Sequence, residues 1–249
     1  MLYFLRQQRR KIIGKRGLLT YLGYAIGEVV LVVLGILIAV YIDNRNDEEK
    51  ERLAELALYE DIISDLRRDS VQFVNLVGGA KRQLRSCYHI YQEINGKATY
   101  QDTIDYDILA ATRTFSPRTA RNNVAAIENI KNHTVRDEIN DYFFQQDFTQ
   151  DAVAEFNEFV LNESRPYYFS HNMIDSKQVF HSNMYGFLPQ NKTLSNYDDV
   201  AARYDDHEFL QIVQYLRVSM GLVIQSLESL IAMNHELINS LQAKLESNN

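Results

Sequence analysis

Apolar residues run almost without interruption from Tyr21 to Ile42, and Glu28 is the one charged residue in this stretch. A helix of this length spans ~33 Å, and the hydrocarbon core of a membrane is ~30 Å thick. No other run in the chain is as long and as apolar. The pattern therefore predicts a single transmembrane helix over residues 21–42.

A heptad pattern follows this span. Apolar residues recur at alternating steps of three and four positions, the spacing of one helix face, and only Ser70 interrupts the set. We predict a long helix over about residues 47–95, in which Gly78-Gly79 marks either a kink or the junction of two helices. The predicted seam consists of Leu56, Tyr59, Ile63, Leu66, Ser70, Phe73, Val77, Ala80, Leu84, Cys87, Tyr91 and Ile94.

The end of the chain repeats this spacing and predicts a helix over about residues 206–245. Asn234 is the one polar residue on its apolar seam, where a buried amide can fix register or oligomeric state. The seam consists of Phe209, Val213, Leu216, Met220, Val223, Leu227, Leu230, Asn234, Leu237 and Leu241.

The middle of the chain predicts a third long helix over residues 134–162, ended by Arg165-Pro166, and two short helices over 104–114 and 119–130. The apolar face assigned to the long helix consists of Val135, Ile139, Tyr142, Phe143, Phe148, Val153, Phe156 and Val160. The predicted fold is all-α, with one N-terminal transmembrane helix followed by a bundle of long helices, or a coiled-coil-like domain, outside the cytoplasm.

Residues 166–199 have poor periodicity and many aromatic side chains, so we expect a loop with a specific role. Two interpretations stay open: the aromatic residues form an interface or a small pocket, or they close the end of the bundle as core. The residues concerned are Tyr167, Tyr168, Phe169, Phe180, Tyr185 and Phe187.

Charge predicts the orientation of the span. Six of the 26 basic residues precede it, whereas 32 of the 33 acidic residues follow Glu28. Basic residues that flank a first span stay in the cytoplasm. We expect residues 1–20 to be a basic cytoplasmic tail, and residues 43–249 to form a periplasmic domain of an inner-membrane protein. The acidic outer part argues against a nucleic-acid partner.

A cleaved signal peptide is the rival interpretation of the apolar run. Such a peptide needs a shorter apolar region and small residues before the cut, but Leu37 stands two places before Ala39. We therefore expect an uncleaved signal-anchor in the lipid bilayer.

Small residues recur on one stripe of the span, at Gly23, Gly27, Gly35 and Ala39, and Glu28 lies beside Gly27. Small residues allow two helices to approach closely, and an ionisable group in a membrane usually has a partner. The stripe predicts contact with a second copy or with another membrane protein. Against this, glycine is common in membrane spans, and Glu28 also suits a place near the inner headgroups.

The same stretch carries a resemblance. Residues 24–39 read YAIGEVVLVVLGILIA, which resembles a family of Bacteroidota single-span membrane proteins with the signature Y-A-I-G-E-[IV]-x-L-V-V-x-G-I-L-I-A near the N-terminus. The family usually continues with I-N-N-W-N, and here Arg45 stands in place of the tryptophan. Residues 130–143 carry a weaker likeness. The resemblance implies a membrane location and a helical outer domain, and implies no activity.

Catalytic motifs are absent from the sequence. No histidine pair has metal-ligand spacing, and no phosphate-binding loop or nucleophile elbow occurs. The single cysteine, Cys87, suits a core position. We predict no catalytic or metal site and no cofactor. The leading hypothesis is a membrane-anchored interaction or scaffold protein. The alternatives are a sensor-like ligand-binding domain that signals through a separate membrane partner and, third, a metal-dependent enzyme.

Overall fold

A computed structural model describes residues 18–101, 103–174 and 195–247. Every regular element in these ranges is helical, apart from one isolated β-bridge between Ile174 and Ser195, so the chain is all-α there as predicted. The elements are α2 (Leu18–Ile94), the 3-10 helix η1 (Asp107–Ala110), α3 (Thr119–Asn123), the 3-10 helix η2 (Ile127–Asn129), α4 (His133–Phe159), the π-helix η3 (Val160–Ser164), α5 (Arg165–Ser170), α7 (Tyr197–Ala201) and α8 (His207–Ser247).

The chain divides into two compact units, Met1–Ala57 and Leu58–Asn249, and each is described by itself. In the first unit, every large apolar side chain from Leu22 to Ile42 is exposed. Of the described helices, α2 and α8 contain stretches long and apolar enough to cross a membrane. The stretch in α8 is 33% buried, whereas that in α2 is 0% buried. The first unit thus carries an uncovered apolar helix that is long enough to cross a membrane. Most of the expected basic tail lies outside the described residues.

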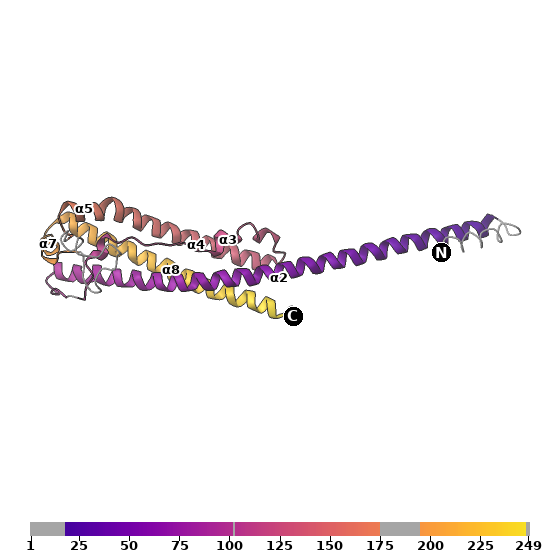
Figure 1. Cartoon of the computed structure of the whole chain (residues 1–249), viewed down its shortest axis with the longest axis horizontal. Helices are drawn as coiled ribbons and strands as arrows, with labels where there is room; N and C mark the ends of the chain where they lie inside the picture. Colours follow the sequence, from indigo (N-terminus) through magenta and orange to yellow (C-terminus); the bar gives the residue numbers. More distant parts are fainter. Residues whose placement is uncertain (1–17, 102, 175–194, 248–249) are drawn as a thin grey trace, which may run out of the picture. The chain divides into compact units, whose positions relative to one another are not determined.

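In the second unit, the part of α2 that follows Ala57 packs beside α8, and the two helices run antiparallel (Figure 1). Near one end, Asn234 Nδ2 donates to the carbonyl of Leu66 at 3.0 Å. Further along, Lys81 Nζ lies 2.6 Å from Glu228 Oε1. Higher numbers in α2 thus pair with lower numbers in α8.

The third long helix, α4, is also antiparallel to α8. The Ser240 hydroxyl donates to Glu138 at 2.6 Å, and the Tyr215 hydroxyl donates to Glu155 at 3.1 Å. Since α2 and α4 both oppose α8, they are parallel to each other. The chain between them, residues 95–132, must therefore run back along the bundle before α4 begins (Figure 1).

All ten seam positions predicted in α8 are buried, and the helix begins and ends within two residues of the predicted range. Asn234 is fully buried, and its Nδ2 also lies 3.2 Å from the hydroxyl of Tyr142. Its Oδ1 has no hydrogen-bond partner among the described residues. The seam amide thus joins all three long helices.

The core stripe of α4 differs from the predicted one. The buried positions follow alternating steps of four and three from Val135, and two of them are the polar residues Gln146 and Thr149. Phe148, which we assigned to the core, is 48% exposed. The prediction was wrong there because it followed apolar residue types instead of the period.

Gly78-Gly79 does not divide α2 in two, since the helix continues to Ile94. A methyl group placed at Gly79 would lie 3.3 Å from Arg113 Nη1. The small residue therefore makes room for an arginine that crosses the helix.

The returning segment contradicts two predicted helices. In place of a helix over 104–114, the chain forms the short η1 and then an extended stretch over residues 111–117. In place of a helix over 119–130, it forms the short α3 and η2. Polar side chains of α2 hold this path, because Gln83 Nε2 donates to Ile108 O at 2.6 Å and Asp69 accepts from Arg118 N at 2.9 Å.

The predicted aromatic loop is partly helical. Arg165-Pro166 does not end the third long helix, because the π-turn η3 continues into α5 with the proline in its first turn. Tyr167 and Tyr168 are buried in the core, whereas Phe169 is 62% exposed. The remaining candidates of this region, Phe180, Tyr185 and Phe187, lie outside the described residues.

Candidate functional site

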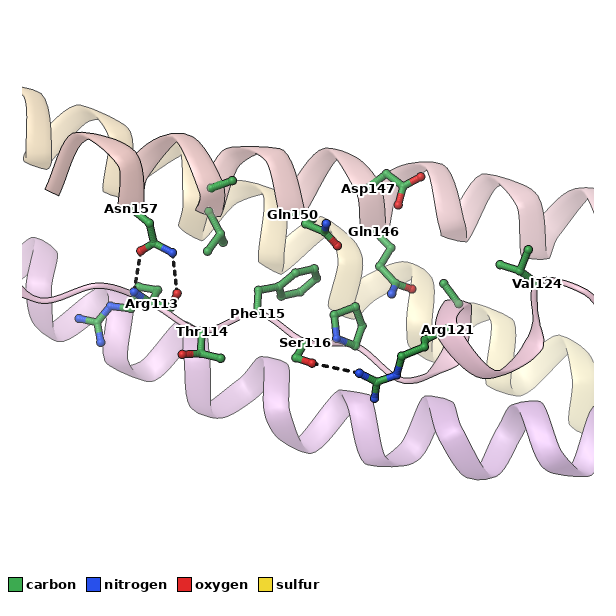
Figure 2. A pocket seen from close by; sticks show the side chains of 14 residues that line it. Arg113, Thr114, Phe115, Ser116, Arg121, Val124, Gln146, Asp147, Gln150 and Asn157 are labelled. Atoms are coloured by element: carbon green, nitrogen blue, oxygen red, sulfur yellow. Dashed lines mark hydrogen bonds between the residues drawn. The ribbon is translucent and has the colours of Figure 1, made fainter. Parts of the chain in front are cut away.

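A groove with a volume of about 620 Å³ lies between α4 and the extended segment of residues 111–117 (Figure 2). Pockets for small ligands usually measure ~300–1,000 Å³. The segment and α3 form one wall, and α4 forms the other. The lining residues are Arg113, Thr114, Phe115, Ser116, Pro117, Ala120, Arg121, Val124, Gln146, Asp147, Gln150, Val153, Ala154 and Asn157.

One end of the groove is closed by a pair of hydrogen bonds between Asn157 and the main chain of Arg113. Arg113 N donates to Asn157 Oδ1 at 2.7 Å, and Asn157 Nδ2 donates to Arg113 O at 2.7 Å (Figure 2). A single side-chain amide thus satisfies both main-chain groups of one residue. This contact fixes the distance between α4 and the segment at that end.

The Arg113 side chain anchors the segment to α2. Its Nε and Nη2 donate to Gln83 Oε1 at 2.8 and 2.5 Å, and Nη2 also donates to Gly79 O at 3.3 Å. Burial, and then the nearby Arg82 charge, lower the pKa of Arg113. A guanidinium that makes three hydrogen bonds to two acceptors has a structural role on this side of the segment.

The segment itself has the alternation of a β-strand. Arg113 and Phe115 are half-buried and Pro117 is buried, whereas Thr114 and Ser116 are exposed. The ring of Phe115 stacks on Phe73 of α2, with ring centroids 5.5 Å apart. No described residue makes a hydrogen bond with the main chain of residues 114–117. The inward side chains thus fix this extended stretch. The main-chain N–H and C=O groups of residues 114–117 remain available for hydrogen bonds.

Gln146 is the exceptional residue of the opposite wall. Its side chain points from α4 toward the segment (Figure 2), and the residue is only 3% exposed. Its Oε1 is buried and has no hydrogen-bond partner among the described residues. A buried polar atom of this kind costs about 1–3 kcal/mol if it stays unpaired. A donor on a molecule that enters the groove would satisfy this atom.

A second polar cluster surrounds Glu93 near the end of α2. Its carboxylate accepts from the hydroxyl of Tyr106 at 3.0 Å and from that of Tyr204, and it lies 3.2 Å from His89 Nε2. Burial, and then the bond to Glu93, raise the pKa of both tyrosines. Because every polar group here has a partner within the protein, the cluster is part of the core and not an open site.

Metal and thiol chemistry have little support in the described residues. No group of three or more His, Cys, Asp and Glu side chains in residues 18–101, 103–174 and 195–247 is placed to hold a metal ion. Cys87 is fully buried, and burial raises the pKa of its thiol to about 12. The thiol therefore stays protonated at neutral pH, as expected for a core residue.

The small residues predicted to contact another helix lie on exposed positions of the first unit. A methyl group added at Gly23, Gly27 or Gly35 would have no atom of the described structure within 4 Å, and Ala39 and Glu28 are also exposed. The described part of this unit contains no second helix against which the stripe could pack.

The residues that shape the groove are absent from the sequence-based candidates. Tyr167 and Tyr168 lie in the core away from it, and neither Gln146 nor Asn157 was selected. The period of α4 could have identified Gln146, because alternating steps of four and three from Val135 reach position 146. A glutamine on this seam, where Thr149 is the other polar residue, is the detectable anomaly.

Residues 28–98 match the model of a family of unknown function (DUF6090). The match begins inside the apolar stretch, covers the rest of α2 and ends just after it, so it spans well under half of the chain. Comparison with curated proteins and with solved structures gave no match. The match includes Gly79 and Gln83, which anchor the segment, but neither wall of the groove.

Proposed function

We propose that this protein is a membrane-anchored interaction module that holds a partner in the groove between α4 and residues 111–117. The observation that carries the proposal is the buried Oε1 of Gln146 beside that groove, which has no hydrogen-bond partner among the described residues. A methionine of similar shape would fill the same space without a buried polar group. A glutamine is useful there if a partner supplies the missing hydrogen bond.

The exposed helix of the first unit and the distribution of charge support the proposed location. The exposed apolar stretch Leu22–Ile42 supports insertion into a lipid bilayer, and the basic residues before it favour a cytoplasmic N-terminus. The acidic bundle then lies in the periplasm of an inner-membrane protein. Acidic charge also disfavours nucleic acid as the partner.

The first test is purification of tagged full-length protein in mild detergent, followed by quantitative mass spectrometry. The variant is Gln146→Met, and its matched control is Gln225→Met, which changes an exposed glutamine of α8. A stoichiometric partner that is lost only from Gln146→Met supports recognition at the groove. An identical set of proteins from all three preparations contradicts it.

A contact within the membrane is a separate part of the proposal. Gly23, Gly27, Gly35 and Ala39, with Glu28 beside them, would face a second copy or another membrane protein. The double variant Gly27→Leu, Glu28→Ala tests this contact by native mass in detergent. A change in oligomeric mass, or loss of a partner that Gln146→Met retains, assigns that contact to the span. If the oligomeric mass and the co-purifying proteins are unchanged in this variant, the proposed contact within the membrane is wrong.

The volume of the groove favours one second candidate, a sensor of small molecules. A space of about 620 Å³ suits a ligand of drug-like size. Thermal unfolding of the full-length protein in detergent, against a panel of amino acids, nucleosides and sugars, tests this function. A rise in Tm for the wild type that Gln146→Met abolishes favours the sensor. If the whole panel leaves Tm unchanged, the interaction module is favoured.

A further inference from the structure

We infer that the occupant of the groove is an extended peptide segment, recognised through its main chain. This inference rests on the proposed function, because it names the class of partner at the same site. Three features of the groove support it: the direction of the free main-chain groups, an existing contact of the same chemistry, and the repeat distance of the two walls.

The first feature is the direction in which the wall offers its main-chain groups. In an extended chain, the N–H and C=O of one residue point to the same side, and residues two apart share that side. Both groups of Arg113 point to α4, because both bind Asn157. The N–H and C=O of Phe115 therefore also face α4, across the open part of the groove.

The second feature is the Arg113–Asn157 contact, which shows the chemistry that these walls use. There, a side-chain amide of α4 pairs with the N–H and the C=O of an extended residue at 2.7 Å each. Gln150 and Gln146 lie about two and three helical turns earlier in α4 and line the same groove. In the open part, amides and a free main-chain edge thus face each other across a space.

The third feature is the repeat distance that an occupant must match. Residues two apart in the segment are ~6.7 Å apart, and Gln146 and Gln150, four residues apart in α4, are ~6 Å apart along the helix axis. An extended peptide presents one residue to Phe115 and the next to the glutamines, with a donor and an acceptor on each side. This is strand addition to a free main-chain edge, with side-chain amides as the second support.

The test uses full-length protein in detergent micelles and a phage-displayed library of random dodecapeptides. Selection on the wild type is followed by measurement of Kd for synthetic copies of the selected peptides. We expect Gln146→Met to weaken binding by about tenfold, the effect of losing one or two hydrogen bonds. Gln225→Met is the matched control and leaves Kd unchanged. Gln150→Ala changes an exposed residue, so it tests the same wall without disturbing the core.

Two further readouts separate main-chain from side-chain recognition. N-methylation of the peptide at successive positions should weaken binding at each residue that faces Phe115 or the glutamines, because each methyl group removes one donor. Hydrogen exchange of the stretch around Phe115 should slow when the peptide binds. Peptides that tolerate N-methylation at every position, or that leave this exchange unchanged, overturn the inference.

The inference can fail while the proposed function stands. If the library yields no peptide that depends on Gln146 or Gln150, recognition of an extended peptide is wrong. A co-purifying partner that Gln146→Met loses would then still support the interaction module, through a folded surface. If there is neither such a peptide nor such a partner, the groove is not a binding site.

Discussion

Two buried carboxylates of α2 have similar burial and different partners. Asp69 accepts main-chain hydrogen bonds from Arg118 and Thr119 and a further bond from the Thr119 hydroxyl, at 2.7–2.9 Å. Glu93 accepts only from side chains, which belong to Tyr106, Tyr204 and His89. One carboxylate thus fixes the path of the main chain, and the other joins side chains.

The difference shows which hydrogen-bond donors could find another acceptor if the carboxylate were removed. A tyrosine hydroxyl that loses its acceptor can rotate or find water, but a main-chain N–H cannot turn without moving the chain. Asp69 therefore determines the start of α3 and, with it, one wall of the groove. Glu93 stabilises the far end of the bundle without shaping that wall.

Replacing Asp69 should have the largest effect. Asp69→Ala leaves two main-chain N–H groups and a buried hydroxyl without their charged acceptor, so we expect a loss of about 3–4 kcal/mol in the free energy of unfolding. Urea unfolding followed by circular dichroism measures it. Asp69→Asn, which keeps one acceptor oxygen, should lose less. A loss below ~1 kcal/mol for Asp69→Ala would show that the main chain is not held by this carboxylate.

Replacing Glu93 should lower the free energy of unfolding by less than replacing Asp69 does, and it should leave the groove intact. In Glu93→Gln the amide oxygen still accepts one hydroxyl, so we expect a loss of about 1–2 kcal/mol under the same urea conditions. Peptide or partner binding should stay at the wild-type level. Equal losses in the free energy of unfolding for Glu93→Gln and Asp69→Ala would show that the two carboxylates do not differ in their structural importance.

Alkaline pH should destabilise the Glu93 cluster. Burial first, and Glu93 second, raise the pKa of Tyr106 and Tyr204 in the folded protein, whereas an unfolded tyrosine titrates near ~10. The protonated tyrosines contribute stability that is fully present below pH ~10 and is lost as pH rises further. Each such tyrosine adds a slope of about 1.4 kcal/mol per pH unit.

The measurement is urea unfolding at a series of pH values from neutral to strongly alkaline. Tyr204→Phe should be less stable than the wild type at neutral pH and should lose stability less steeply above pH ~10. Other buried tyrosines, such as Tyr142 and Tyr168, provide the remaining slope in both proteins. Parallel curves for the wild type and the variant would show that Tyr204 titrates normally.

The smallest expected change has the opposite sign. Gln146→Met removes a buried oxygen that has no partner in the described structure, so the free protein should gain about 0.5–1 kcal/mol or stay unchanged. Thermal unfolding without any partner measures it, with Gln225→Met as control. Destabilisation by more than ~1 kcal/mol would show that Gln146 supports the core. In that case its place beside the groove would be incidental.

The pattern of apolar residues identified the long helices and missed the segment between them. In α8, hydrophobic spacing alone determines which side is buried, so Phe209 through Leu241 follow the prediction. In residues 111–117, the conformation depends on Gln83, Asp69 and Asn157, which lie far away in the sequence. Hydrogen bonds between polar side chains and a main chain that is distant in the sequence produce no periodic pattern of apolar residues. The wall formed by this segment could therefore not be predicted.

The aromatic residues show a related limit. Tyr167 and Tyr168 were one group with Phe169 in the sequence, yet the first two are core and the third is exposed. The π-turn η3 adds a residue to the helical turn and thereby resets which side faces the bundle. A single inserted residue in a helix is invisible to a pattern that assumes one constant period.

The packing of α2 against α8, the last helix of the chain, has a consequence for synthesis. The contact between Leu66 and Asn234 joins residues 168 positions apart. The first helix of the bundle can therefore make this contact only after the last helix has been synthesised. At ~5–20 residues per second, translation leaves the core side of α2 uncovered for roughly 10–30 s. Contacts between such distant positions also slow folding itself. A chain that ends before α8 will therefore expose the apolar seam of α2 permanently and become a substrate for chaperones and proteases.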